Sequence, residues 1–252
     1  MTPMLQSRND TGKRAARRVG WAAAQSERRQ QDWMRSYLSA VLTRDLRDIA
    51  DIEKLAELPK FARLLAEHSG QLVDYSKFGG SVNVSHKTGQ RYVALLEQVF
   101  LVSTLQPWST NALKRIAKTP KLHFLGSELL VTTRGSSFDR VKANRGEFGA
   151  LLESLVFSEV LKLVTSSDLR LTPYHCLDQQ MHKVDIVLER DDGMIVGIEV
   201  KASTTVKSAD FAGPRKLAET CKGRFAFGVV LYDSAGLVPF GDKLAAAPQS
   251  CL

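Results

Sequence analysis

The sequence predicts an α+β protein in which a largely helical N-terminal domain precedes a smaller α/β domain with a mixed sheet. Two observations lead to this fold class. From Trp33 onward, apolar residues recur with spacings of three and four, which indicates a helix. In the second half, two β-branched runs flank the turn Asp191-Asp192-Gly193, which indicates a hairpin. We expect the helical domain to span 31–131 and the α/β domain to span 146–252.

Residues 1–30 form a basic leader that is poor in large apolar side chains, and we expect it to be disordered or weakly helical. It is either a nucleic-acid-binding tail or simply a solvated leader. The formal net charge of +8 permits a nucleic-acid partner without requiring one. The three cysteines are far apart and not in metal spacing, which suits a reducing cytosol. No apolar run approaches the roughly 20 residues of a membrane span, so we expect a cytoplasmic protein with no membrane partner.

The predicted helices of the first domain end in a helix-turn-helix pattern. The first runs from Trp33 to Ile49, and a second follows Pro59 over 60–67. A short helix over 75–80 leads through a turn to Ser85, which we predict as the N-cap of a helix that ends at Gln98. The outward residues of its first turns are of the type that a recognition helix presents to DNA: His86, Lys87, Gln90 and Arg91.

Two strands, 100–108 and 118–124, are expected to follow that helix and to form a wing, which makes the domain winged-helix-like. Lys114 and Arg115, with Lys118 and Lys121, add a basic hairpin beside the wing. Units of this kind occur both as DNA readers and as protein-docking modules, and the sequence leaves both interpretations open.

A polar segment over 132–145 is predicted as the domain linker, and the α/β domain follows it. Its elements are a helix over 147–164, the hairpin strands on either side of Gly193, a helix over 208–221 and a buried strand over 224–232. Glu153 lies inside the apolar arc of the first helix, where a carboxylate must be paired, protonated or bound to a metal.

The predicted hairpin register brings two carboxylates together. With Gly193 in the left-handed conformation, Ile186 pairs with Ile198 and Leu188 with Val196, so that aliphatic residues face one another. The same register sets Asp185 opposite Glu199, with Cβ atoms roughly 5 Å apart. Lys201 shares the face of Glu199. A cation such as Mg²⁺, bound by Asp185 and Glu199, would relieve their repulsion. The alternative is an ordinary hairpin with a surface Glu-Lys pair.

This order of elements, with Glu153, Asp185, Glu199 and Lys201 as the motif, resembles the core of the PD-(D/E)xK nuclease superfamily. The chain is also similar to a narrower group, the C-terminal domain of unknown function of bacterial and archaeal AAA-type P-loop ATPases. The segments that carry this second resemblance are WMRSYLSAVLTRDL (33–46), LLEQVFLVSTLQPW (95–108), KTPKLHF (118–124), ESLVFSEVLK (153–162), KVDIVLE (183–189), IEVKAS (198–203) and GLVPFGDKLAAAP (236–248).

The chain departs from that group at several positions. It has Gly126 where members usually carry Asp, Lys183 where they carry Glu, and His175 where they carry Arg. The P-loop pattern is absent, because Asp242 separates Gly241 from Lys243 in GLVPFGDK and no Ser or Thr follows. We therefore expect no ATP site in this chain, and the resemblance implies a separate ATPase subunit as a possible partner.

Three functions are compatible with these patterns. The first is a nucleic-acid-binding or partner-binding module on a nuclease-like scaffold. The second is a Mg²⁺-dependent DNA endonuclease in which Glu153, Asp185, Glu199 and Lys201 are catalytic. The third is a remnant without independent function.

Overall fold

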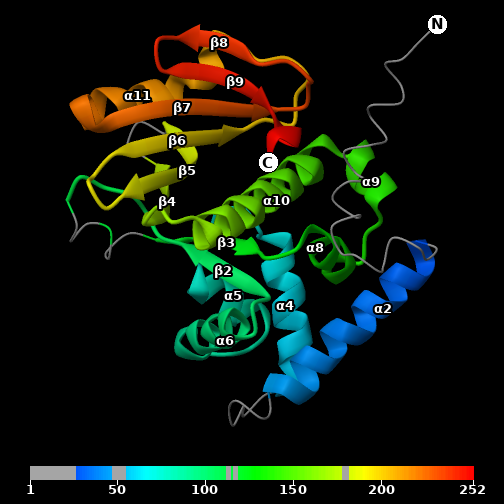
Figure 1. Ribbon diagram of the computed structural model, residues 1–252. Helices are drawn as coiled ribbons and strands as arrows, with labels where there is room; N and C mark the ends of the chain where they lie inside the picture. Colours follow the sequence, from blue (N-terminus) through cyan, green and yellow to red (C-terminus); the bar gives the residue numbers. More distant parts are fainter. Residues whose placement is uncertain (1–26, 47–54, 112–114, 116–118, 178–181) are drawn as a thin grey trace, which may run out of the picture.

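The computed structural model describes residues 27–46, 55–111, 115, 119–177 and 182–252, which form helices and two β-sheets. The predicted α+β class is confirmed, and the larger sheet is mixed, as expected. Figure 1 shows the long helix α10 (Arg145–Ser166) between the N-terminal helices and the larger sheet. Short turns of 3-10 helix lie at Leu55–Glu57, Ser208–Phe211, Lys222–Arg224 and Gln249–Cys251.

The N-terminal half is mainly helical. Helix α2 (Glu27–Ala40) begins earlier than predicted, inside the expected leader, and continues into a π-helical turn, Val41–Asp45. Helices α4 (Leu58–Glu67), α5 (Tyr75–Ser81) and α6 (His86–Gln98) follow. The predicted N-cap of α6 is confirmed, because the Ser85 hydroxyl accepts a hydrogen bond from the Thr88 N–H at 3.1 Å. The rest of the predicted leader, 1–26, lies outside the described residues.

A three-stranded sheet lies beside these helices. Its order is β1 (Gln71–Leu72), β3 (Lys121–Phe124) and β2 (Val102–Leu105), and both pairings are antiparallel. The two strands predicted for the wing therefore pair with each other, although β2 is shorter than the apolar run suggested. At Phe100 the chain takes a left-handed conformation with φ of 56°, and this turn separates α6 from β2.

The segment predicted as a linker is helical over most of its length. The end of α8 (Ser127–Arg134) and the whole of α9 (Phe138–Ala143) lie in it, and Val141 is buried in the same apolar cluster as the N-terminal helices. The Asn144 side chain then caps α10 by accepting from the N–H groups of Gly146 and Glu147. The domain boundaries themselves remain a prediction.

The six-stranded sheet forms the C-terminal half. Its strands are, in spatial order, β4 (Leu171–Leu177), β5 (Lys183–Arg190), β6 (Ile195–Val200), β7 (Phe225–Tyr232), β9 (Leu244–Pro248) and β8 (Val238–Gly241). Apolar residues of α10 such as Phe157 pack against Ile186 and Ile198 of the sheet. Leu217 of α11 (Ala212–Cys221) packs against Val187 in a separate cluster. The two clusters place α10 and α11 on opposite sides of the sheet.

The predicted hairpin register is confirmed near the turn. Ile186 pairs with Ile198 and Leu188 with Val196. Gly193 has φ of 82°, the left-handed conformation that the three-residue loop requires. The ladder between β5 and β6 stops at Ile186, so the next expected pair, Asp185 with Glu199, is not part of it.

Strands β4, β8 and β9 were not predicted, and their sequences explain why. Strand β4 contains Pro173, which is tolerated here because β4 forms the edge of the sheet. Strand β9 is rich in alanine, a residue depleted in strands. It nevertheless pairs in parallel with the buried strand β7, and Ala246 is fully buried. Tertiary packing thus overrides the weak local preference of these segments.

Helix α11 approaches β5 so closely that residue 213 must be glycine. A Cβ atom on Gly213 would lie 1.9 Å from the carbonyl oxygen of Lys183. We expect Gly213→Ala to lower the free energy of unfolding by about 1–3 kcal/mol, because the helix must move away from the strand. Urea unfolding measures this change. The control is Gly149→Ala in α10, where a Cβ atom would meet nothing within 4 Å; it should be neutral or stabilising. Equal stability of both variants would contradict this account.

Candidate functional site

The structure brings together the four side chains that the sequence predicts for the acidic site. Glu153 comes from the middle of α10, Asp185 from β5 and Glu199 from β6, and Lys201 directly follows β6. The three carboxylate residues are only 8%, 1% and 6% exposed, respectively. The alternative interpretation, a polar surface pair on an ordinary hairpin, is therefore wrong for Glu199.

Two further lysines lie between the carboxylates. Lys183 Nζ lies 2.6 Å from Asp185 Oδ1 and 3.3 Å from Glu153 Oε2. Lys121 Nζ lies 3.3 Å from the same Asp185 oxygen and also contacts Glu153 Oε1. Each of these two ammonium groups thus bridges Glu153 and Asp185. We call the six residues Lys121, Glu153, Lys183, Asp185, Glu199 and Lys201 the buried ion cluster, after its three carboxylates and Lys121, which are buried; the side chain of Lys183 reaches the surface.

Lys121 corrects one interpretation of the sequence. The sequence places it in a basic hairpin beside the wing, whereas in the structure it is buried and contacts Glu153 in the ion cluster. It belongs to β3 of the smaller sheet, whereas Asp185 belongs to the larger sheet. The ion cluster therefore links the two sheets. The alternation Lys-Leu-His-Phe in β3 carries the signal that could have indicated this, since it puts Lys121 and His123 on one face.

The Asp185 side chain also takes the place of a backbone hydrogen-bond acceptor between β5 and β6. Its Oδ2 accepts a hydrogen bond from the Val200 N–H at 2.9 Å, beyond the point where the ladder ends. Both of its oxygens are therefore engaged. Lys183 and Lys201 are the more exposed members of the cluster. The Lys201 Nζ lies 3.2 Å from Glu199 Oε1 and 3.9 Å from Asp210 Oδ1.

Burial and mutual charge shift the ionisation of these groups. Burial, reinforced by the charge of Asp185, raises the pKa of Glu199 to about 7 and also raises the pKa of Glu153. Burial would raise the pKa of Asp185 as well, but Lys121 and Lys183 lower it. Burial opposes the charged form of Lys183, yet the carboxylates of Asp185 and Glu153 raise its pKa. Asp185 and Lys183 are therefore the firmly charged pair of the cluster.

His123 lies next to the cluster and was not predicted as a site residue. Its ring stacks on Phe157 with centroids 4.5 Å apart, and its Nδ1 lies 3.4 Å from the Ser154 hydroxyl. Burial and the positive charge of Lys121 hold the pKa of His123 well below its ordinary value, so the ring is neutral at physiological pH. His123 therefore fills space against α10 without compensating the buried carboxylates.

The residues present do not fit a divalent cation as they are arranged. Mg²⁺ needs several oxygen ligands in near-octahedral geometry. Both oxygens of Glu153 contact lysine ammonium groups, and those of Asp185 are held by lysines and a backbone N–H. Within the described residues, no group of three or more His, Cys, Asp or Glu side chains is placed to share a metal ion. One oxygen, Glu199 Oε2, is buried without a hydrogen-bond partner in the described part of the chain.

The residues predicted to contact nucleic acid lie in two different environments. His86, Lys87, Gln90 and Arg91 are all exposed on α6. Arg115 is instead held within the protein. It forms a bidentate ion pair with Glu189, at 2.5 and 3.2 Å, and lies 4.9 Å from the centre of the Tyr174 ring. Lys114 lies outside the described residues.

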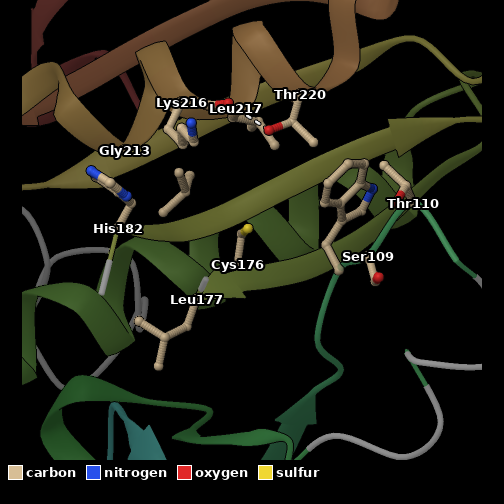
Figure 2. A pocket seen from close by; sticks show the side chains of 11 residues that line it. Ser109, Thr110, Cys176, Leu177, His182, Gly213, Lys216, Leu217 and Thr220 are labelled. Carbon is tan, nitrogen blue, oxygen red and sulfur yellow. Dashed lines mark hydrogen bonds between the residues drawn. The ribbon is translucent and has the colours of Figure 1, made fainter. Parts of the chain in front are cut away.

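A small cavity lies away from the ion cluster, between α11 and the strands β4 and β5 (Figure 2). Its volume is about 140 Å³, and the side chains of Cys176, His182 and Lys216 are part of its lining. The buried indole N–H of Trp108, which also lines it, has no hydrogen-bond partner among the described residues. A space of this size suits a few water molecules better than a cofactor.

Comparisons with known proteins give families without an assigned function. A family model described as "Domain of unknown function (DUF8612)" matches residues 20–139. A second, "Domain of unknown function (DUF4143)", matches residues 148–252. The chain is similar to the uncharacterized protein Rv2008c of Mycobacterium tuberculosis and the uncharacterized protein Mb2031c of Mycobacterium bovis. Each is 27% identical over 226 residues, which is 89% of this chain and 49% of the relative. The chain spans about half the length of these curated relatives.

Among the helices of the described residues, none is both long and apolar enough to cross a bilayer.

Proposed function

We propose that the chain is a DNA-binding module on a nuclease-like scaffold, in which the buried ion cluster holds the two sheets together. The observation that carries the proposal is the exposed polar face of α6. Its first turns present His86, Lys87, Gln90 and Arg91 to solvent, directly after a short helix and a tight turn. Side chains of this kind at the start of a helix suit contacts with phosphates and base edges.

The order of elements around α6 supports a winged-helix arrangement. Helix α4 is followed by β1, α5, α6, β2 and β3, and the strands form one sheet in the order β1-β3-β2. In such a unit α6 would be the recognition helix, and the β2–β3 hairpin would be the wing. Helix-turn-helix proteins place the second helix of the pair in the major groove.

The order of the C-terminal elements supports a nuclease-like scaffold. Helix α10 is followed by β4, β5, β6, α11 and β7, with Asp185 on β5 and Glu199 on β6. Lysine ammonium groups hold the oxygens of Asp185 and Glu153, and this arrangement favours a structural role over a catalytic one. Members of the similar ATPase-associated group usually carry Glu at the position of Lys183. In this chain, therefore, one of the two ammonium groups that occupy the oxygens of Asp185 and Glu153 comes from a lysine that stands in place of a glutamate.

The second candidate function is a Mg²⁺-dependent endonuclease. The specific observation in its favour is Glu199 Oε2, a buried carboxylate oxygen that lacks a hydrogen-bond partner among the described residues. A cation shared by this oxygen and Asp185 would require Lys121 or Lys183 to withdraw from Asp185. Mg²⁺ binding would raise the unfolding temperature of the wild type, as for any ligand of the folded state. Asp185→Asn would abolish both that rise and any cleavage of plasmid DNA.

Fluorescence anisotropy with a labelled duplex tests DNA binding. We expect an affinity that falls steeply with salt, because lysine and arginine contacts to phosphates release counterions. The double variant Lys87→Ala/Arg91→Ala should bind more weakly, with a salt slope smaller by about two, or roughly one for each lost contact. The matched control is Arg170→Ala/Lys207→Ala, which removes two exposed positive charges from the C-terminal half.

The control variant should bind like the wild type. Equal weakening by both double variants would indicate a non-specific effect of net charge and would contradict the assignment of α6. Failure of the wild type to bind DNA at low salt would overturn the DNA proposal. Docking to a protein, such as a separate ATPase subunit, would then be the remaining role for this face.

A further inference from the structure

A second candidate binding site lies in a groove between the N-terminal helices and α10. Its volume is about 260 Å³, and its walls come from α2, the turn after α6, the start of α8 and the C-terminal half of α10. None of the six residues of the ion cluster lines this groove. We call it the aromatic groove and define it by Trp33, Tyr37, Phe100, Glu128, Glu159 and Lys162.

Three exposed aromatic side chains line the aromatic groove. Trp33 and Tyr37 are one turn apart on α2, and their rings stack with centroids 5.5 Å apart and planes 7° apart. They are 38% and 42% exposed, and Phe100 is 78% exposed. Phe100 has a left-handed backbone conformation, which is uncommon for a bulky residue and turns its ring outward. Exposed aromatic side chains gathered in one hollow are typical of recognition surfaces.

The charge of the groove is set by Glu128. Glu159 is paired with Lys162, whose Nζ lies 2.9 Å away, so these two charges compensate each other. Glu128 has no such partner: its Oε2 is buried and accepts no hydrogen bond from any described residue. Burial raises the pKa of Glu128. A buried carboxylate oxygen without a hydrogen bond destabilises the unbound protein. A hydrogen-bond donor on a ligand would remove this free-energy cost.

We propose that the aromatic groove binds an arginine side chain presented by a partner protein. A guanidinium group is planar, so it can lie against the stacked Trp33 and Tyr37 rings through cation–π contact. Its N–H groups can at the same time donate to the Glu128 carboxylate. The volume is below the roughly 300–1,000 Å³ typical of cofactor pockets, and a single side chain fits it better. Two glutamates and one lysine line the groove, and this excess of acidic side chains disfavours an anionic ligand.

The apolar part of the lining favours a protein partner. Met34, Leu125, Leu129 and Leu155 also line the groove, so a residue that enters it brings its neighbours against apolar side chains. Interfaces that combine aromatic residues with a central charged anchor are common between proteins. None of the four exposed polar residues of α6 lines the groove, so binding of arginine there is independent of DNA binding.

A pair of short peptides tests the proposal on the full chain. One peptide carries arginine between two leucines, and the other carries citrulline, its neutral isostere, at the same position. The readout is the NMR signal of the Trp33 indole N–H during titration with millimolar peptide. We expect a saturable shift with the arginine peptide and at least about tenfold weaker binding of the citrulline peptide, corresponding to about 1.4 kcal/mol.

The key variant is Glu128→Gln, which keeps the shape of the side chain and removes its charge. It should weaken the arginine peptide about fivefold or more and leave the citrulline peptide unaffected. Its unfolding temperature should not fall, because the variant removes a buried charge that has no partner among the described residues. Glu219→Gln, an exposed substitution on α11, is the matched control and should bind like the wild type. An absent or non-saturable shift, or equal affinity for both peptides, would overturn the proposal.

Discussion

Substitution of Lys121 by methionine should lower the free energy of unfolding by about 3–5 kcal/mol, the largest effect that we expect from any single change in this chain. The lysine contacts both Glu153 and Asp185, and all three side chains are almost completely buried. Methionine fills a similar volume but supplies no charge, so one buried carboxylate is left without compensation. Thermal unfolding should show a decrease of about 10 °C for a chain of this size.

A matched substitution separates this effect from the mere loss of a lysine. Lys162 also pairs with a glutamate, but its side chain is 69% exposed. Lys162→Met should therefore change stability by less than about 1 kcal/mol. Equal effects of the two variants would show that the buried ion cluster contributes nothing special to stability.

The double variant Lys121→Met/Glu153→Gln gives a second, independent measure. Glutamine keeps the size of Glu153 and removes the charge that Lys121 neutralises. If the loss in the single variant comes from an uncompensated buried carboxylate, the double variant should recover part of it. Additive destabilisation would instead point to packing around Lys121 as the cause.

The sequence was sufficient to predict the parts of the fold that depend on local patterns. The hairpin register followed from two constraints that agree, the turn at Gly193 and the facing aliphatic residues such as Ile186 and Ile198, and the structure has this register. The cap at Ser85 likewise depends on residues within one turn of helix. The three carboxylates of the site could be predicted because each lies on a helix or strand whose apolar residues recur with a clear period.

The composition of the ion cluster could not be predicted in the same way. Lys121 is 32 residues from Glu153 and 64 from Asp185 in the chain, and no local pattern records such distances. Lys183 stands out in the sequence only as a departure from the Glu of the similar group, and its role in bridging Asp185 and Glu153 depends on how α10 lies against β5. The polar segment after Thr132 was misleading for a related reason: its few apolar residues, such as Val141, are buried by other helices. Tertiary contacts therefore decide what these segments do.

Glu199 should make the stability of the protein depend on pH between about 4.5 and 7. Burial, and after it the charge of Asp185, raises its pKa in the folded state from the ordinary 4.5 to about 7. The folded protein thus binds a proton more tightly at this position than the unfolded chain does. Unfolding free energy is unaffected below pH 4.5, falls as the pH rises through this window, and is lower by about 3 kcal/mol above it.

Glu199→Gln should remove that dependence, because glutamine is neutral at every pH and can still accept from Lys201 with its oxygen. Urea unfolding at pH 4.5 and pH 8 measures the difference between the variant and the wild type. We expect nearly equal stability at the lower pH, and a variant that is more stable by about 3 kcal/mol at the higher pH. Other titratable groups, including Glu153, whose pKa burial also raises, are present in both proteins and largely cancel in the comparison.

The exposed substitution Glu219→Gln on α11 provides the control, since it removes the same charge from a solvated position and should give a small difference that does not change with pH. Parallel pH profiles for Glu199→Gln and the wild type would mean that the Glu199 carboxylate is compensated in the folded protein. Such compensation would come either from Lys201, the ion-pair partner of Glu199 at 3.2 Å, or from an added cation. A repeat of the wild-type profile with and without Mg²⁺ therefore distinguishes a structural ion cluster, whose profile Mg²⁺ leaves unchanged, from a metal site, in which Mg²⁺ removes the loss of stability above pH 4.5.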